Sequence, residues 1–214
     1  MPEGRDDSSG VTGSGPESVC LLDNPEQIGA HLRRALEASG GRVVLVPVDF
    51  SPHSHCALLQ ACRLADLMSA AVVVLHVMFD PTELPGYYSR VIKRRRSERI
   101  QQRAQAEFDA FLAEARAENL YLASLDHCLP LVLTGQPVDI ILQAVDALQP
   151  EMVVMGSQGN TGLKRISIGS KAEQVVRLCP VPTTIVKACD RLRERWRAAA
   201  MSAGAVRSSA GTHD

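Results

Sequence analysis

Two apolar runs of strand length, residues 42–50 (RVVLVPVDF) and 70–77 (AAVVVLHV), constrain the fold of this chain most strongly. Nearly continuous, valine-rich runs are typical of strands that are buried on both faces of a parallel sheet. Between the two runs Ser51 can cap a helix, Pro52 suits its first turn, and apolar residues recur at helical spacing as far as Met68. The order strand, helix, strand therefore predicts two parallel strands joined by a crossover helix.

The same alternation continues along the chain. A further strand falls within residues 119–136, where Pro130 interrupts the apolar pattern and leaves the position of the strand open. The other expected elements are helices at 90–118, 137–149 and 170–178 and strands at 151–155 and 182–188. The whole pattern predicts an α/β fold: an open five-stranded parallel sheet with helices on both faces and a ligand crevice outside the carboxyl ends of the strands.

The segments before and after this alternation differ in composition from the domain. Residues 1–22 are polar and glycine-rich, and we expect them to form a disordered tail. Residues 23–40 predict an extra amphipathic helix, which buries its apolar face against the main fold or against a partner subunit. We expect a single domain at 41–189 and a C-terminal extension at 190–214 that begins as a helix and ends disordered.

Composition narrows the classes of partner. The formal net charge of -1 favours neither a nucleic-acid nor a membrane partner. Residues 1–19 are polar and lack the apolar segment expected of a secretory signal, and no apolar run approaches the length of a membrane span. None of the six cysteines forms a CxxC pair, which indicates reduced thiols and a cytoplasmic protein. A metal site at His53, His55 and Cys56 is disfavoured, because the three residues fall in the first turns of a helix. The basic stretch at 90–99 is open to three interpretations: a solvated helix face, a lid over bound phosphates, or a surface for anionic lipid or nucleic acid.

A glycine-rich loop follows the fourth predicted strand. Its glycines, Gly156, Gly159, Gly162 and Gly169, match neither the P-loop pattern GxxxxGK[ST] nor the dinucleotide pattern GxGxxG. The residue types nevertheless favour an anion, because glycines allow close approach of the backbone and a helix N-terminus follows. Ser170 begins an S-x-x-E capping box, so its hydroxyl serves its own helix, a phosphate, or both.

The glycine spacing, taken with its surroundings, resembles a known family. Gly156-x2-Gly159-x9-Gly169-Ser170 matches the G-x2-G-x9-G-[S/T] motif of the ATP-binding branch of the universal stress protein family, and the flanking strands match in register. The resemblance spans residues 42–188. It implies a Rossmann-like domain, a homodimer formed through the last strand, and bound ATP or another adenine nucleotide, with or without Mg²⁺.

By position, the resemblance implies contacts at three places. Asp49 lies near the ribose and the adenine, and Pro47 and Val48 line the same edge. Val77 offers backbone groups and an apolar wall to the adenine. Phosphate contacts are implied for Gly156, Gly159, Gly169 and Ser170, with Lys171 beside them.

The expected function is binding rather than catalysis. No carboxylate near the implied phosphates is available as a general base, since Glu173 is assigned to the capping box, and we expect no catalytic residue and no metal ligand. We expect a nucleotide-dependent dimeric sensor or scaffold in stress signalling, with an unidentified protein as a further partner. The alternatives are a weak ATPase, a dimeric scaffold without nucleotide turnover, and an adenylate-using enzyme of the same fold class.

Overall fold

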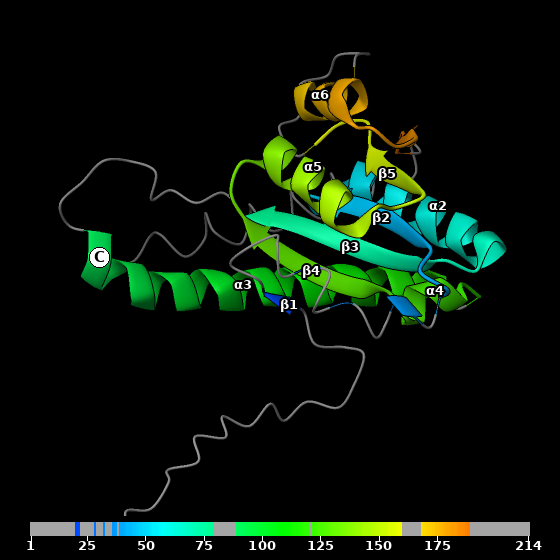
Figure 1. Cartoon of the computed structure of the whole chain (residues 1–214). Helices are drawn as coiled ribbons and strands as arrows, with labels where there is room; N and C mark the ends of the chain where they lie inside the picture. The colour runs from blue at the N-terminus through cyan, green and yellow to red at the C-terminus, as the bar shows by residue number, and fades with distance from the viewer. Residues whose placement is uncertain are drawn as a thin grey trace, which may run out of the picture.

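The computed structural model describes residues 20–21, 28, 32, 36–37, 39–78, 89–119, 121–159 and 168–188. In these residues six strands form one parallel sheet in the order β1-β4-β3-β2-β5-β6 (Figure 1). The strands are β1 (Cys20–Leu21), β2 (Val43–Val48), β3 (Ala71–Met78), β4 (Leu129–Thr134), β5 (Met152–Gly156) and β6 (Thr183–Val186). The five longer strands form the open parallel sheet that the apolar runs predict.

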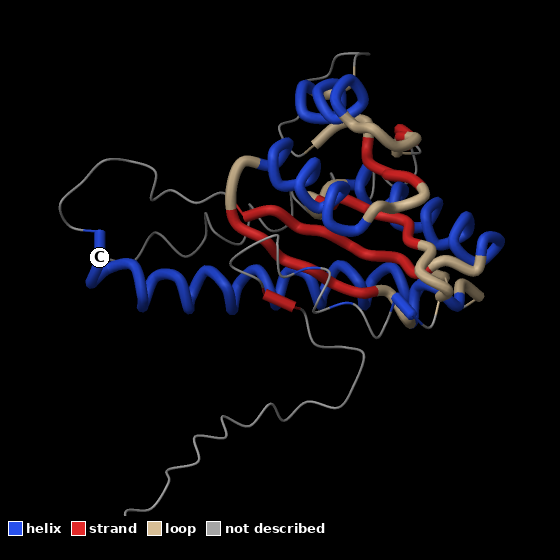
Figure 2. The backbone as a smooth tube through the Cα atoms, in the orientation of Figure 1, coloured by secondary structure: helices blue, strands red, loops and turns tan. Residues whose placement is uncertain are grey.

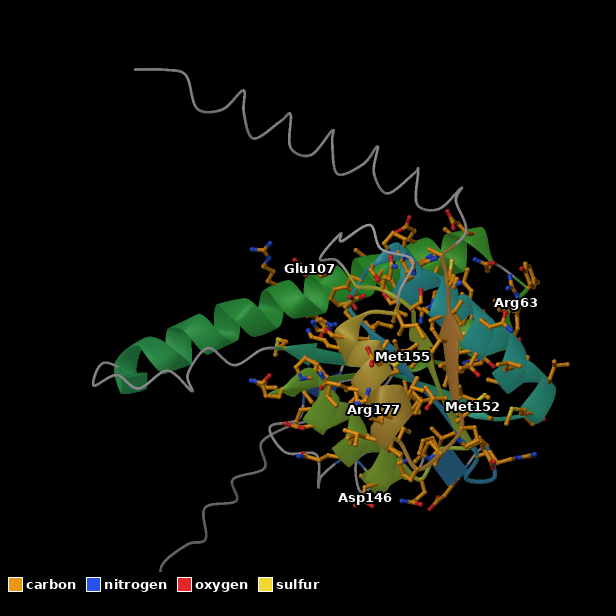
Figure 3. All side chains as sticks on the ribbon, turned by 90° about the horizontal axis from the view of Figure 1, so that it is seen from above. Arg63, Glu107, Asp146, Met152, Met155 and Arg177 are labelled. Carbon is orange, nitrogen blue, oxygen red and sulfur yellow. The ribbon has the colours of Figure 1, made fainter. Side chains whose placement is uncertain are left out.

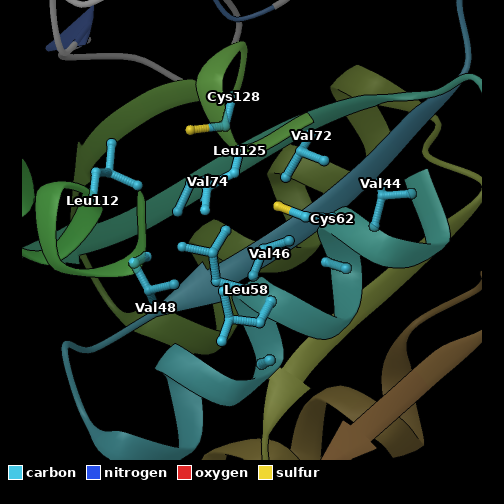
Figure 4. Packing of buried hydrophobic residues seen from close by; sticks show 14 of the residues in the cluster. Val44, Val46, Val48, Leu58, Cys62, Val72, Val74, Leu112, Leu125 and Cys128 are labelled. Carbon is cyan, nitrogen blue, oxygen red and sulfur yellow. The ribbon is translucent and has the colours of Figure 1, made fainter. Parts of the chain in front are cut away.

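Helices cover both faces of this sheet (Figure 2). The helices are α2 (Pro52–Met68), α3 (Ser89–Glu118), α4 (Ala123–Asp126), α5 (Pro137–Leu148) and α6 (Ser170–Leu178). Side chains alternate along the central strands, so that Val44 and Val46 of β2 pack with α2, α3 and α4, whereas Val43 and Leu45 pack with α5 and α6. Figure 4 shows the first of these two layers, in which Leu58 of α2 lies close to Val46. The uninterrupted apolar runs are thus explained by burial on both faces.

Pro130, which obscured the third long strand in the sequence, is the second residue of β4. It lies opposite Val74 of β3, and within the described part of the chain the far side of β4 is paired with the two residues of β1, at Leu131 and Val132. Proline lacks a backbone N–H and is accommodated near the start of a strand or at a sparsely paired edge. The irregular pattern therefore comes from a proline at a strand start, and from the short helix α4 that precedes it.

The N-terminal segment differs in part from the expected tail and helix. Cys20 and Leu21 pair with β4, so the prediction of disorder over 1–22 is wrong at these two residues, and the rest of that range lies outside the described residues. Ile28 and Leu32 are helical and buried in the layer that contains α5 and α6. These two described residues of the predicted helix are therefore buried against the main fold, and most of the range 23–40 lies outside the described residues. The predicted C-terminal extension at 190–214 lies outside the described residues.

Two cysteines pack in the layer shown in Figure 4 as small apolar groups. Burial raises the pKa of the Cys62 thiol strongly, and burial raises the pKa of Cys128 to about 11 against a lowering influence of Arg116. Both thiols remain protonated at neutral pH, and an apolar packing role follows. Among the described residues, no cluster of three His, Cys, Asp or Glu side chains could hold a metal ion, and no helix could cross a membrane.

The basic stretch at 90–99 lies in the N-terminal part of α3, where the backbone is helical. Figure 1 shows that this part of α3 extends past the sheet, while the C-terminal part packs beneath it through Phe108, Phe111 and Leu112. The side chains of the basic stretch lie outside the described residues. The three interpretations of its charge therefore stay open.

Candidate functional site

A pocket of about 390 Å³ opens where β2 and β5 part at the carboxyl end of the sheet. Within the described strands β2 pairs with β5 only through Val44 and Leu45, so that the last residues of β2 have no partner on that side. From β2 the chain crosses to β3, while β5 continues to β6 on the opposite side of the sheet. This is the point at which strand order reverses, and open parallel sheets bind ligands at such points.

All nine residues that the sequence singled out line this one pocket. They are Pro47, Val48, Asp49, Val77, Gly156, Gly159, Gly169, Ser170 and Lys171. The sequence analysis missed seven further lining residues, Ser54, Leu75, Pro137, Ile141, Met155, Gln158 and Ala172. The period of two along β3 could have found Leu75, which shares a face with Val77. Pro137 and Ile141 reach the pocket through the packing of α5 on the sheet, and no local pattern signals that approach.

On the β2 side, the turn after the strand is held by a short chain of hydrogen bonds. Asp49 Oδ1 accepts from the Ser51 N–H at 3.2 Å, and Ser51 Oγ accepts from the Ser54 N–H at 3.2 Å, which confirms Ser51 as the N-cap of α2. The Ser51 hydroxyl also lies 3.4 Å from the carbonyl oxygen of Gln158, to which it donates. The carboxylate of Asp49 is thereby placed beside the glycine loop. A Cβ atom on Gly159 would lie only 2.5 Å from Asp49 Oδ2.

On the β5 side, Ser157 fixes the base of the glycine loop. Its N–H donates to Val186 O at 2.8 Å, and its carbonyl oxygen accepts from the Gly169 N–H, also at 2.8 Å, so the two ends of the loop meet. Its Oγ lies 2.9 Å from His53 Nδ1, which also accepts from the Ala188 N–H at 3.3 Å. Because Nδ1 is then an acceptor, the Ser157 hydroxyl is the donor. His53, weighed above as a metal ligand, is thus a buried hydrogen-bond acceptor that joins α2, the loop and the end of β6.

Gly156 lets the loop leave β5 directly against the first turn of α2. A Cβ atom there would lie 2.8 Å from the carbonyl carbon of His53 and 2.9 Å from the Ser54 nitrogen. Both neighbours are backbone atoms, which cannot move aside as a flexible side chain can. The glycine is therefore required by packing as well as by any ligand.

The start of α6 differs from the predicted capping box. Gly169 is the N-cap, with φ −63° and ψ 149°, and Ser170 is the first helical residue. Glu173 donates its N–H to Gly169 O and pairs its carboxylate with Arg177 at 2.9 Å; Arg177 is labelled on α6 in Figure 3. The capping-box prediction is wrong because Ser170 sits one position too far into the helix to cap it, and the structure shows no side-chain cap bond there. Ser170 lines the pocket, at the first N–H groups of α6, which have no acceptor within the helix.

The pocket therefore combines three kinds of surface. Leu75, Val77 and Ile141 supply an apolar wall, and Asp49 supplies a carboxylate that can accept hydrogen bonds from hydroxyl groups. Glycine backbone and the N-terminus of α6 supply N–H donors and a positive helix dipole. A ligand with an apolar ring, hydroxyl groups and an anionic group matches these three surfaces. Residues 160–167, which include Gly162, lie outside the described residues.

Known proteins are similar to this chain over about two thirds of its length. The universal stress protein in QAH/OAS sulfhydrylase 3′region of Thermus aquaticus is 27% identical over 146 residues, which cover 68% of this chain and 98% of that protein. Universal stress protein MJ0577 of Methanocaldococcus jannaschii is 26% identical over 152 residues, covering 67% and 93%. Among solved structures, universal stress protein UspA from Lactobacillus plantarum shares the fold, with a TM-score of 0.55 at 23% identity over 68% of this chain and 97% of that one.

The sequence model of the universal stress protein family matches residues 41–187. The matched region begins just before β2 and ends just after β6, so it contains the five long strands and every described residue that lines the pocket. Because the match covers most of the chain, this chain belongs to the universal stress protein family.

Proposed function

We propose that the chain binds an adenine nucleotide, ATP in the first place, and acts as a nucleotide-dependent sensor or scaffold. One observation carries the proposal: the Asp49 carboxylate, the glycine backbone and the N-terminus of α6 converge on one pocket with an apolar wall. This combination matches the parts of a nucleotide, since a base needs an apolar surface, ribose hydroxyls need acceptors, and phosphates need N–H donors.

In this proposal each surface takes one part of the nucleotide. The adenine lies against Val77, with Pro47 and Val48 along its edge, and the ribose hydroxyls donate to Asp49. The phosphates lie against the backbone of Gly156 and Gly159 and at the start of α6. The last contacts are assigned to Gly169, Ser170 and Lys171. Mg²⁺ would come with the nucleotide, held by phosphate oxygens and water.

A binding role is favoured over turnover by the acid–base groups of the pocket. Among the described lining residues Asp49 is the single carboxylate, and it already accepts a hydrogen bond from the Ser51 N–H. A hydrolase needs a group that orients and deprotonates water at the phosphate end, and the carboxylate is assigned to the ribose end. Weak ATPase activity is therefore the second candidate.

A homodimer through β6 is part of the same proposal. Among the described strands β6 lies at one edge of the sheet, and an unpaired edge strand tends to associate or to be covered. Val176 and Leu178 of the neighbouring helix α6 are 45% and 57% exposed. This apolar surface beside the edge strand of the described sheet suits a second copy of the chain.

Titration of purified, nucleotide-stripped protein with ATP, monitored by calorimetry, tests the proposal. We expect saturable binding by the wild type and a loss of about tenfold or more in affinity for Gly159→Ala, since the new methyl group must push the Asp49 carboxylate aside. Leu67→Ala, at a side chain that is 85% exposed and outside the pocket, is the matched control and should bind as the wild type does. Wild-type protein that neither binds ATP nor carries it after purification would refute the proposal.

Light scattering on the same samples measures whether the chain forms a dimer. Steady release of ADP would favour the weak ATPase as the function.

A further inference from the structure

Phe50, which follows Asp49, has an unusual backbone conformation with φ 59°. The other described non-glycine residues with positive φ are Ser69 and Gln149, which end α2 and α5, where the left-handed conformation is ordinary. Phe50 instead lies between a strand and the N-terminus of a helix. A bulky residue keeps such a conformation only where surrounding contacts impose it, and such residues cluster at functional sites.

The contacts that impose it are aromatic. The Phe50 ring is stacked on the imidazole of His76 in β3, with centroids 4.3 Å apart and an interplanar angle of 27°. Its other contacts are edge-to-face with Phe108 at 5.7 Å and Phe111 at 5.5 Å, both of which are buried side chains of α3. The ring is therefore enclosed by two elements that do not belong to its own turn.

His76 also holds the residue on the other side of Asp49. It lies opposite Val48 in the β2–β3 ladder, and its Nδ1 is 3.0 Å from the Val48 carbonyl oxygen. Since a carbonyl can only accept, Nδ1 carries the proton and donates. Burial lowers the pKa of His76, against the raising influence of its hydrogen bond to Val48 and of the charges of Asp49 and Glu107, so the imidazole is mainly neutral at pH 7.

Asp49 is thus flanked by two residues that the same imidazole holds, Val48 through its carbonyl and Phe50 through its ring. Its carboxylate is oriented further by the Ser51 N–H and lies against Gly159. We propose that Phe50 and His76 are positioning residues for ligand binding: together they set the backbone of Asp49 so that its carboxylate meets the ribose hydroxyls of the nucleotide. This inference rests on the proposed function, which assigns Asp49 to the ribose.

The test compares two ligands that differ only at the ribose, ATP and 2′,3′-dideoxy-ATP, by calorimetry on the whole chain. Phe50→Leu removes the stacked ring, and we expect it to weaken ATP binding about tenfold while changing dideoxy-ATP binding less than about twofold. In an Asp49→Asn background Phe50→Leu should have little further effect on ATP, because the two changes act through one contact.

His76 gives a second pair of variants, which keeps the proposal testable if Phe50→Leu folds poorly. His76→Asn retains an N–H donor where Nδ1 lies but removes the ring that stacks on Phe50, so it should weaken ATP binding less than His76→Leu, which removes both contacts. Neither variant should weaken dideoxy-ATP binding more than about twofold. Urea unfolding of each variant establishes that the titrated protein is folded.

Equal weakening of both ligands, or no weakening of either, would overturn the positioning role while leaving the proposed function intact. Wild-type protein that binds neither ligand would overturn the proposed function, and this inference with it.

Discussion

The two strand ends that border the pocket are held in place by different kinds of contact. At the end of β2 the contacts are made by side chains: the Asp49 carboxylate accepts from the Ser51 N–H, and Phe50 is enclosed by aromatic rings of β3 and α3. At the end of β5 the contacts are made by the main chain, because Gly156 and Ser157 meet α2, β6 and the far end of the loop through backbone contacts. Side-chain changes at the β2 end should therefore alter ligand binding more than folding. At the β5 end even one methyl group added to Gly156 should alter the fold.

The largest expected effect is that of Gly156→Ala. The new Cβ would lie 2.8 and 2.9 Å from backbone atoms of His53 and Ser54, so either β5 or the first turn of α2 must shift. We expect a loss of about 3 kcal/mol in the free energy of unfolding, the upper part of the range for overpacking. Urea denaturation monitored by circular dichroism measures this loss in the free energy of unfolding.

Gly169→Ala is the matched control for that substitution. A Cβ on Gly169 would meet its nearest neighbours at 3.5 and 3.6 Å, which is ordinary contact, and its φ is −63°. We expect a loss below about 1 kcal/mol, the cost of alanine at an N-cap. An equally small loss for Gly156→Ala would show that the β5 end tolerates side chains as readily as the β2 end, and the contrast would be broken.

Ser157→Ala separates side-chain from main-chain holding within the β5 end. The substitution removes the hydrogen bond to His53 Nδ1 and leaves the backbone bonds to Val186 and Gly169 in place. We expect a loss of about 1 kcal/mol, the usual net worth of one buried hydrogen bond. Urea unfolding at pH 7 measures it, with wild type as reference. A loss as large as that of Gly156→Ala would mean that the serine side chain, rather than the backbone, secures the loop.

Features that could be predicted from the sequence are those that local spacing encodes. Valine-rich runs identify β2 and β3, and the glycine spacing together with Asp49 identifies residues that the fold brings to one pocket. In a parallel sheet the carboxyl ends of all strands lie at one edge, so residues that follow strands meet without further information.

Features that depend on distant partners could not be predicted. Cys20 and Leu21 form a strand only because β4 offers an unpaired edge, and Pro130 is tolerated because that edge is sparsely paired. Ile141 lines the pocket through the packing of α5. The role of Phe50 depends on rings from β3 and α3, which no spacing within its own segment reveals.

Ser170 is a further residue whose role could not be predicted from local spacing. Its replacement is also expected to have the smallest effect on the free energy of unfolding. Since Gly169 is the N-cap, Ser170→Ala should leave the free energy of unfolding within about 0.5 kcal/mol of wild type. Ser51→Ala, at the serine that does cap a helix, should cost about 1 kcal/mol in the same urea assay. Ser170→Ala should still weaken ATP binding about threefold in calorimetry, because Ser170 lines the pocket at the N-terminus of α6 and its hydroxyl is proposed to contact the phosphates. If Ser170→Ala instead destabilises the fold as Ser51→Ala does and leaves ATP affinity unchanged, the serine serves its helix. The β5 end would then, like the β2 end, depend on a capping side chain.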